Sequence, residues 1–150
     1  MKQTPQEQKL EETLRSAAWV AGGFMGEDRR SPAEIIAADQ AALVRLHYTA
    51  QQIAARMEAI TRLATSGLGN WVSIDSLRQA RVDEAKGSLP CPWPHSGRFA
   101  KRVTTVRRLD NNQTLFWSDL NIHMIAEHTF FEGRGSYFRI DPEKIIPMIF

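Results

Sequence analysis

The sequence is poor in several features that define common classes of protein. It has one cysteine among 150 residues, so no disulfide can form within the chain and a reducing, cytoplasmic setting is expected. The formal net charge is only +2, which argues against a surface built throughout for nucleic acid. No run approaches the roughly 20 apolar residues that span a bilayer. The charged residues 1–15 also lack the apolar core of a signal peptide. We therefore expect a cytoplasmic protein that does not associate with a membrane.

Rare metal-binding residue types gather in one part of the chain. The single cysteine and three of the four histidines fall within residues 91–128. A cysteine thiolate and neutral imidazoles are typical zinc ligands, and four of them complete a tetrahedral shell. The sequence therefore predicts a zinc site whose ligands are Cys91, His95, His123 and His128.

The first half of the chain reads as helical. Three helix-start signals each precede apolar residues at helical spacing: Thr4-Pro5-Gln6-Glu7, Ser31-Pro32-Ala33-Glu34 and Thr49-Ala50-Gln51-Gln52. They predict helices over about residues 5–21, 32–47 and 50–66. The last two are joined so tightly at His47 that we expect a helical hairpin. A DNA-reading helix-turn-helix is disfavoured, because residues 57–60 contain no turn former.

The second half has the character of strands followed by a helix. Residues 98–109 and 113–118 predict a β-hairpin, with Asp110-Asn111-Asn112 as its turn. Ser118 or Asp119 then caps a helix that runs to about Phe130. A further short strand is expected over 137–140, followed by a short C-terminal helix or turn. Residues 70–74 are compatible with a short strand. The composition of 77–86 favours a helix, although its alternation also fits a strand.

Together these elements predict an α+β fold with two regions. Residues 1–68 form an N-terminal helical hairpin region of about three helices. Residues 69–150 form a β-hairpin–helix module that carries the metal site and a further short strand. The two regions are separate, or they form one compact domain.

The order of the elements gives the predicted ligands a way to meet. A hairpin returns the chain to its own start, so the helix that follows it can lie beside the proline-rich loop at Cys91. Prolines 92 and 94 stiffen that loop and lower the entropy lost when Cys91 and His95 converge. Two ligands from the loop and two from the helix then reach one ion.

Part of this stretch resembles a known kind of zinc module. Leu120-Asn121-Ile122-His123, with His128 further on, is similar to the helix of a two-cysteine, two-histidine zinc finger. The order of loop, hairpin and helix resembles a treble-clef zinc fold, over residues 91–128 only. This sequence has His95 where a second cysteine is usual. His123 and His128 lie about 140° apart around an ideal helix. The helix must therefore tighten or unwind near His128.

Other roles are open for the same residues. Without a metal, Cys91 would be a small buried hydrophobe, and His123 would pair with Asp119 or Glu127, one helical turn away. His128 would then cap carbonyl groups at the end of the helix. In a metal-dependent enzyme, Glu127 would act as general base beside an open metal position. A nucleophilic Cys91 is a further option.

Two kinds of partner are also compatible with the sequence. A basic strip on the hairpin predicts binding to nucleic acid; its members are Arg98, Lys101, Arg102, Arg107 and Arg108. The N-terminal helices and the apolar C-terminus, residues 145–150, predict a protein partner or self-association. The leading hypothesis is a zinc-binding interaction module whose metal is structural.

Overall fold

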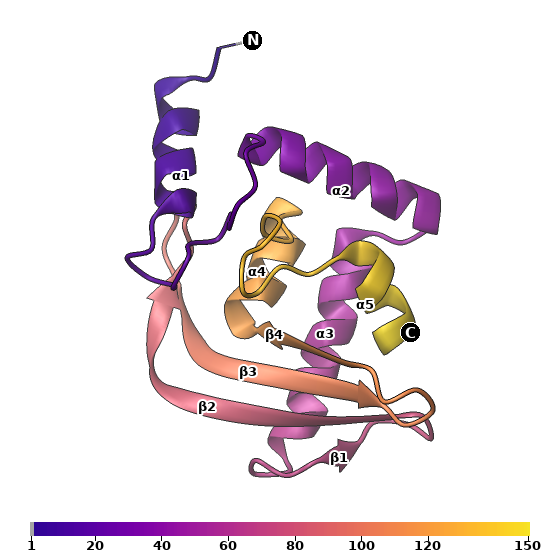
Figure 1. The fold of residues 1–150 in the computed structure, drawn as a ribbon. Coiled ribbons are helices and arrows are strands. Elements are labelled where there is room, and N and C mark those ends of the chain that lie inside the picture. Colours follow the sequence, from indigo (N-terminus) through magenta and orange to yellow (C-terminus); the bar gives the residue numbers. More distant parts are fainter. Residues whose placement is uncertain (1) are drawn as a thin grey trace.

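The computed structural model describes residues 2–150 of the chain, and it has the predicted α+β fold. This part of the chain forms five helices and one antiparallel sheet with the strand order β1-β2-β3-β4 (Figure 1). The helices are α1 (Pro5–Arg15), α2 (Pro32–Leu46), α3 (Ala50–Thr65), α4 (Asp119–His128) and α5 (Pro142–Ile149). The strands are β1 (Val72–Ser73), β2 (Arg78–Pro90), β3 (Arg98–Arg108) and β4 (Thr114–Ser118). No helix in residues 2–150 has the length and apolar character needed to cross a membrane.

The three predicted helix starts are confirmed. The side chains of Thr4, Ser31 and Thr49 each accept a hydrogen bond from the backbone N–H three residues later. Such caps satisfy backbone donors that a helix leaves without a partner. Figure 1 shows α2 lying across the end of α3, whereas the tight connection at His47 had suggested two helices packed along each other. His47 ends α2 in a left-handed conformation, with φ of 63°.

The predicted extension of the first helix to residue 21 is wrong. After Arg15 the chain turns back at Ser16, whose backbone is extended, and the N–H of Phe24 donates to the carbonyl of Leu14 at 2.8 Å. This return buries both Leu14 and Phe24. Residues 17 and 18 are exposed alanines, so continuing the helix through them would have buried little apolar surface.

The predicted helix over residues 77–86 is also wrong, because this segment is the first half of β2. Arg78, Ala80 and Val82 are buried while Gln79 and Arg81 between them are only partly buried, which is the alternation of a half-buried strand. The hairpin of β3 and β4 is confirmed. The strand expected at 137–140 is wrong: the N–H of Arg139 closes a turn on the carbonyl of Ser136.

One large core joins the helices to the sheet. Its buried members include Ile53 and Met57 of α3, Trp117 of β4, and Ile145 and Ile149 of α5. Most of the apolar C-terminus is therefore part of the chain's own core. A second core cluster packs α1, the loop after it and α2 against α4. Cys91 lies in this second cluster, which brings the predicted metal site to its edge.

Candidate metal centre

The loop that carries Cys91 and His95 connects β2 to β3, at residues 91–97. The loop bends tightly, because the N–H of His95 donates to the carbonyl of Trp93 at 2.9 Å. Cys91 is buried against Leu120 and Met124, in the same apolar cluster. The loop between β2 and β3 therefore lies against α4.

Helix α4 carries the other two predicted ligands. Ser118 caps its start in a reciprocal hydrogen-bonded box with Asn121. Asp119 is tied to β3 by a hydrogen-bonded ion pair with Arg102, with the Arg102 Nε to Asp119 Oδ2 distance at 2.8 Å. The helix ends at His128, and Thr129 follows in a left-handed conformation with φ of 52°. Both histidines thus lie on one short helix whose start is anchored to the sheet.

The four predicted ligands converge. One donor atom from each of Cys91, His95, His123 and His128 lies within 4.8 Å of every other. The Nε2 atom of His95 is 3.1 Å from that of His123 and 3.3 Å from that of His128. The Sγ atom of Cys91 is 3.5 Å from Nε2 of His128. Around a tetrahedral zinc ion, two nitrogens lie about 3.3–3.4 Å apart and a sulfur and a nitrogen about 3.6 Å apart. The cluster is therefore able to hold a metal ion.

The hydrogen bond of His95 determines which of its two ring nitrogens carries the proton and which has a free lone pair directed at the cluster. Its Nδ1 atom is 2.9 Å from the carbonyl oxygen of Ser96. A carbonyl oxygen only accepts, so Nδ1 carries the proton, and Nε2 of the neutral ring has a free lone pair. This lone pair can accept a proton from only one of the two neighbouring imidazoles. A cation at the centre would bind all three nitrogens without such a conflict.

Burial keeps the imidazoles of α4 neutral. It lowers the pKa of His128 to about 4, and the neighbouring His123 and His95 add to this effect by charge repulsion. The pKa of His123 is also lowered, first by burial and then by His95. Burial raises the pKa of the Cys91 thiol, opposed by a hydrogen bond from the Trp93 backbone. A buried thiol with a raised pKa is a poor free nucleophile, whereas a bound cation would stabilise its thiolate.

Two aromatic side chains that were not predicted as site residues hold the histidines in place. The ring of Trp93 stacks on that of His128, with centroids 4.1 Å apart and an interplanar angle of 5°. Phe99 stacks on His123 with centroids 4.2 Å apart. The position of Trp93 between two loop prolines was a usable signal, since a rigid loop that carries ligands also positions its other side chains.

The five-residue spacing of His123 and His128 does not prevent convergence. His128 is the last residue of α4, so its side chain reaches back over the loop while His123 projects from the middle of the helix. Within residues 2–150, His123 forms no hydrogen bond with Asp119 or Glu127; its Nε2 atom lies 3.1 Å from that of His95 instead. The side chain of His128 was alternatively expected to cap carbonyl groups, but its Nε2 atom contacts Cys91 and His95.

A groove lies directly beside the cluster. It has a volume of about 520 Å³, and its walls include Phe99, His123 and Glu127. Glu127 is exposed on the solvent side of α4. The side chain suggested as a general base thus lines a cavity of substrate size next to His123, one of the four clustered residues.

The basic strip of the hairpin is largely engaged within the chain. Four of its five members donate hydrogen bonds to other residues: Arg98 to Ser88, Arg102 to Asp119, Arg107 to Gln79, and Arg108 to Asp110. Arg107 also lies over the ring of Trp71, at 3.8 Å from its centroid. Binding of nucleic acid by this strip would have to compete with these contacts.

No family model matches the chain, and searches of curated proteins and of solved structures give no significant match. The assignment of a function therefore rests on the geometry of the cluster.

Proposed function

We propose that the protein binds one zinc ion through Cys91, His95, His123 and His128, and that it is an interaction module which this structural zinc stabilises. The observation that carries the proposal is the convergence of four donor atoms, each within 4.8 Å of the others, from a loop and a helix. Three of their separations lie close to the edge lengths of a zinc tetrahedron.

The donor set favours zinc over other divalent ions. Magnesium and calcium prefer oxygen ligands, and this cluster offers one sulfur and three nitrogens. Zinc takes mixed thiolate and imidazole shells in tetrahedral geometry. The lowered pKa values of His123 and His128 agree with this role, because a metal ligand must have its lone pair free.

A structural role follows from the number of donors. Four protein ligands fill a tetrahedral shell and leave no position for a substrate. The ion would cross-link the loop at residues 91–97 to α4, which lies about 30 residues further along the chain. Closing a loop of this length with a metal restricts the unfolded chain and stabilises the fold.

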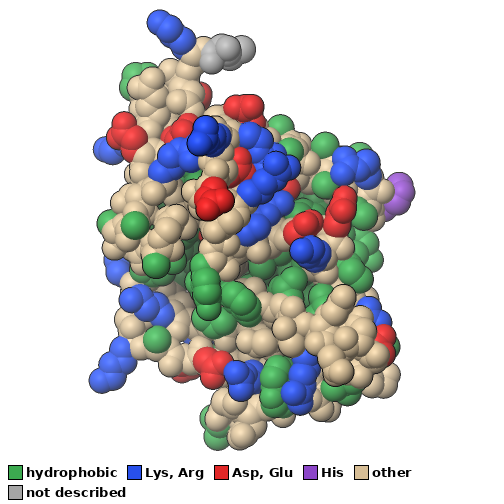
Figure 2. Space-filling view, in the orientation of Figure 1, with side chains coloured by type: hydrophobic (Ala, Val, Ile, Leu, Met, Phe, Trp, Pro, Cys, Tyr) green, Lys and Arg blue, Asp and Glu red, His purple; other side chains and the backbone are tan. Residues whose placement is uncertain are grey.

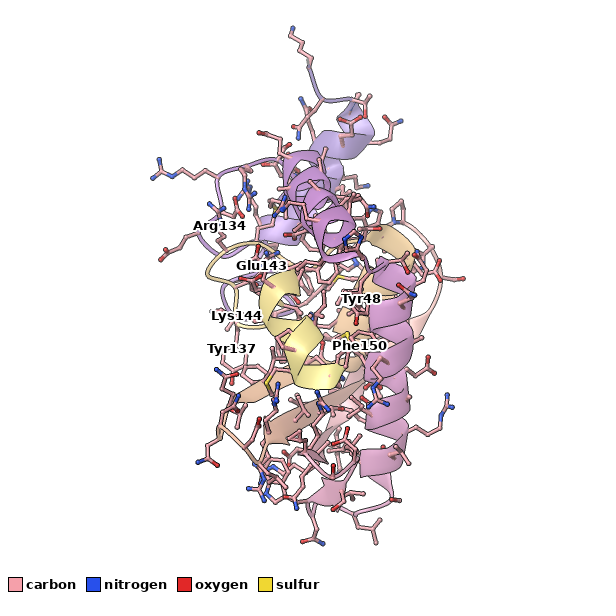
Figure 3. All side chains as sticks on the ribbon, turned by 90° about the vertical axis from the view of Figure 1, so that its right-hand side faces the viewer. Tyr48, Arg134, Tyr137, Glu143, Lys144 and Phe150 are labelled. Atoms are coloured by element: carbon pink, nitrogen blue, oxygen red, sulfur yellow. The ribbon has the colours of Figure 1, made fainter. Side chains whose placement is uncertain are left out.

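The interaction surface that we propose lies on the N-terminal helices and the end of the chain. Val44 of α2 and Leu63 of α3 are large apolar side chains exposed to solvent. Phe150 is also exposed and packs on Tyr48, with ring centroids 4.5 Å apart (Figure 3). Sedimentation of the protein over a range of concentrations tests self-association. Val44→Glu and Leu63→Glu should weaken any assembly that uses these helices.

Cobalt substitution tests the metal site and its coordination number together. Cobalt(II) in a four-coordinate site absorbs visible light strongly, and a bound thiolate adds a charge-transfer band in the near ultraviolet. We expect both features in the wild-type protein and loss of the charge-transfer band in Cys91→Ser. His47→Ala is the matched control, because His47 is the one histidine outside the cluster. A protein that develops neither feature does not have the proposed site.

The same spectrum distinguishes the enzyme alternative. The groove beside His123 gives that alternative a specific structural basis, with Glu127 as general base. It requires an open coordination position, which appears as weak five-coordinate absorption that changes when small anions are added. Strong absorption that is insensitive to added anions supports the structural role.

A further inference from the structure

A cationic groove lies on the side of the molecule formed by α2 and the segment 134–144. Its volume is about 660 Å³, and five cationic and three acidic side chains line it. The cationic residues are Arg30, Arg45, Arg134, Arg139 and Lys144. Figure 2 shows Lys and Arg side chains gathered on this face beside α2. The groove is unrelated to the metal cluster and shares no lining residue with it.

The three acidic residues, Asp39, Asp141 and Glu143, cancel only part of this positive charge, because the groove has five cationic side chains. Asp39 is held by both terminal nitrogens of Arg139, one of them at 2.9 Å from Oδ1. The ion pair of Arg45 with Glu143 is 3.7 Å long and joins two well-exposed side chains, so it is weak. The side chains of Arg134 and Lys144 form no ion pair within residues 2–150. These two cations are available to a ligand.

The backbone that presents Arg134 is rigid. The turn at 133–136 packs against the loop after α1 so closely that a Cβ atom at Gly26 would lie 2.2 Å from the turn's backbone. The N–H of Arg134 donates to Asp28 at 3.1 Å. The same carboxylate binds the guanidinium of Arg30, with an Nη2 to Oδ2 distance of 2.7 Å. One buried aspartate therefore fixes the backbone at Arg134 and the guanidinium of Arg30, while the side chain of Arg134 extends from this fixed backbone into solvent.

An exposed aromatic ring outside the lining of the groove lies on the same side of the molecule as these cations. Tyr137 follows the turn directly and is 70% exposed. It packs against Phe116 and Phe138, with ring centroids 5.2 Å and 5.0 Å away. Figure 3 shows Tyr137, Lys144 and Arg134 along the same side of the molecule, next to α5. Two contacts support the tyrosine from behind, while its large exposed area is free to stack on a planar group.

We propose that this groove binds a nucleotide unit, either as a free nucleotide or within single-stranded nucleic acid. Arg134 and Lys144 contact the phosphate, and Tyr137 stacks on the base. Free cations beside an exposed aromatic platform are the combination by which proteins hold single-stranded nucleic acid and nucleotides. The turn at 133–136 contributes the side chain of Arg134. Its backbone is not expected to bind the phosphate, because the turn follows a helix and does not lie at a helix N-terminus.

The test is fluorescence anisotropy on the intact, metal-loaded protein at low salt. The probes are a fluorescein-labelled single-stranded oligonucleotide and a fluorescent adenosine triphosphate analogue. We expect saturable binding of at least one probe. The probe with the higher affinity shows whether the groove takes a free nucleotide or single-stranded nucleic acid. Arg134→Ala with Lys144→Ala should weaken binding roughly tenfold or more and flatten the salt dependence by about two units of slope. Tyr137→Ala should weaken it by at least about fivefold.

A matched control removes two cations elsewhere. Lys9→Ala with Lys86→Ala changes two exposed lysines of α1 and β2, which lie outside both the groove and the basic strip, and should leave binding unchanged. Loss of affinity in this control equal to that in the groove variant overturns the proposal, as does failure of both probes to bind. The nucleotide assignment is overturned if unlabelled pyrophosphate displaces the probe as well as unlabelled nucleotide does and Tyr137→Ala has no effect on binding. The replaced residues of the groove variant form no ion pair in the described chain, so their loss should not unfold the protein.

Discussion

Trp93 covers one face of His128, with the two ring planes within 5° of parallel. The stack fixes the orientation of the imidazole whose Nε2 atom lies nearest to the Cys91 sulfur among the three histidines. Groups that orient a metal ligand typically contribute 10–100-fold to metal affinity. We expect Trp93→Leu to lower zinc affinity by roughly this factor, measured by competition with a chromogenic chelator. Trp19→Leu, at an exposed position outside the cluster, should have no such effect.

Removal of the metal should loosen one part of the molecule selectively. The loop at 91–97 and the end of α4 would lose their cross-link, whereas α3 is held by the main core. We expect a strong chelator to increase amide hydrogen exchange in residues 91–97 and 125–129, with little change in residues 53–61. Uniform exchange throughout the chain would mean that the metal holds the entire fold. Unchanged exchange would mean that no metal had been bound.

A buried hydrogen-bonded chain ties α3 to the sheet. The Trp117 Nε1 donates to the Thr61 hydroxyl at 2.9 Å, and this hydroxyl lies 2.6 Å from that of Thr104. Thr61→Val keeps the shape of the side chain but leaves two buried polar groups without a partner. We expect it to lower the free energy of unfolding by about 2–4 kcal/mol in urea denaturation. Thr104→Val should cost less, because Thr61 and Trp117 remain bonded to each other.

The buried carboxyl of Glu132 should make the stability depend on pH. Burial raises its pKa to about 8 from the usual 4.5, although Ser136, Asn121 and Arg139 oppose the shift. The folded state therefore retains a proton that the unfolded chain releases. The contribution to stability is complete below about pH 4.5, falls as the pH rises to about 8, and is constant above that value.

Glu132→Gln should remove this dependence. Its amide can accept from Asn121 and donate to the Ser136 hydroxyl, so it imitates the protonated acid. At pH 8 we expect this variant to be more stable than wild type by more than about 1 kcal/mol, because each pKa unit corresponds to about 1.4 kcal/mol. The difference should shrink towards pH 5. Glu12→Gln, at an exposed position on α1, should show no such trend.

The local signals in the sequence predicted the elements well where capping and turn residues were present. Ser31, Thr49 and Ser118 start the helices as expected, because a cap is a local interaction between neighbouring residues. The segment that became β2 carries no such signal. The strand conformation of residues 78–84 depends on pairing with β3, from Arg78 with Arg108 to Glu84 with Arg102, and the local propensity of the segment does not report partners so far along the chain.

The clustering of Cys91, His95, His123 and His128 could be predicted because cysteine and histidine are rare in this chain. Cysteine and histidine are metal-binding residue types wherever they occur, so they can be recognised without the fold. The order of loop, hairpin and helix then brings the four residues together as expected. Residue type does not assign Trp93 and Phe99 to the site, because aromatic residues are frequent in this half of the chain. For Trp93 the usable signal is its position between the two loop prolines. The cationic groove was not predicted either. It combines Arg30 and Arg45 with residues about 100 positions further along, which only the folded chain places together.

The most direct test of the account is the metal content of the purified protein. Elemental analysis of wild type expressed without added metal should give about one zinc per chain. Cys91→Ser should contain much less zinc and should unfold at a lower temperature, while His47→Ala should match wild type in both. Wild-type protein without bound metal, with an unchanged melting temperature in Cys91→Ser, would contradict the proposed zinc centre.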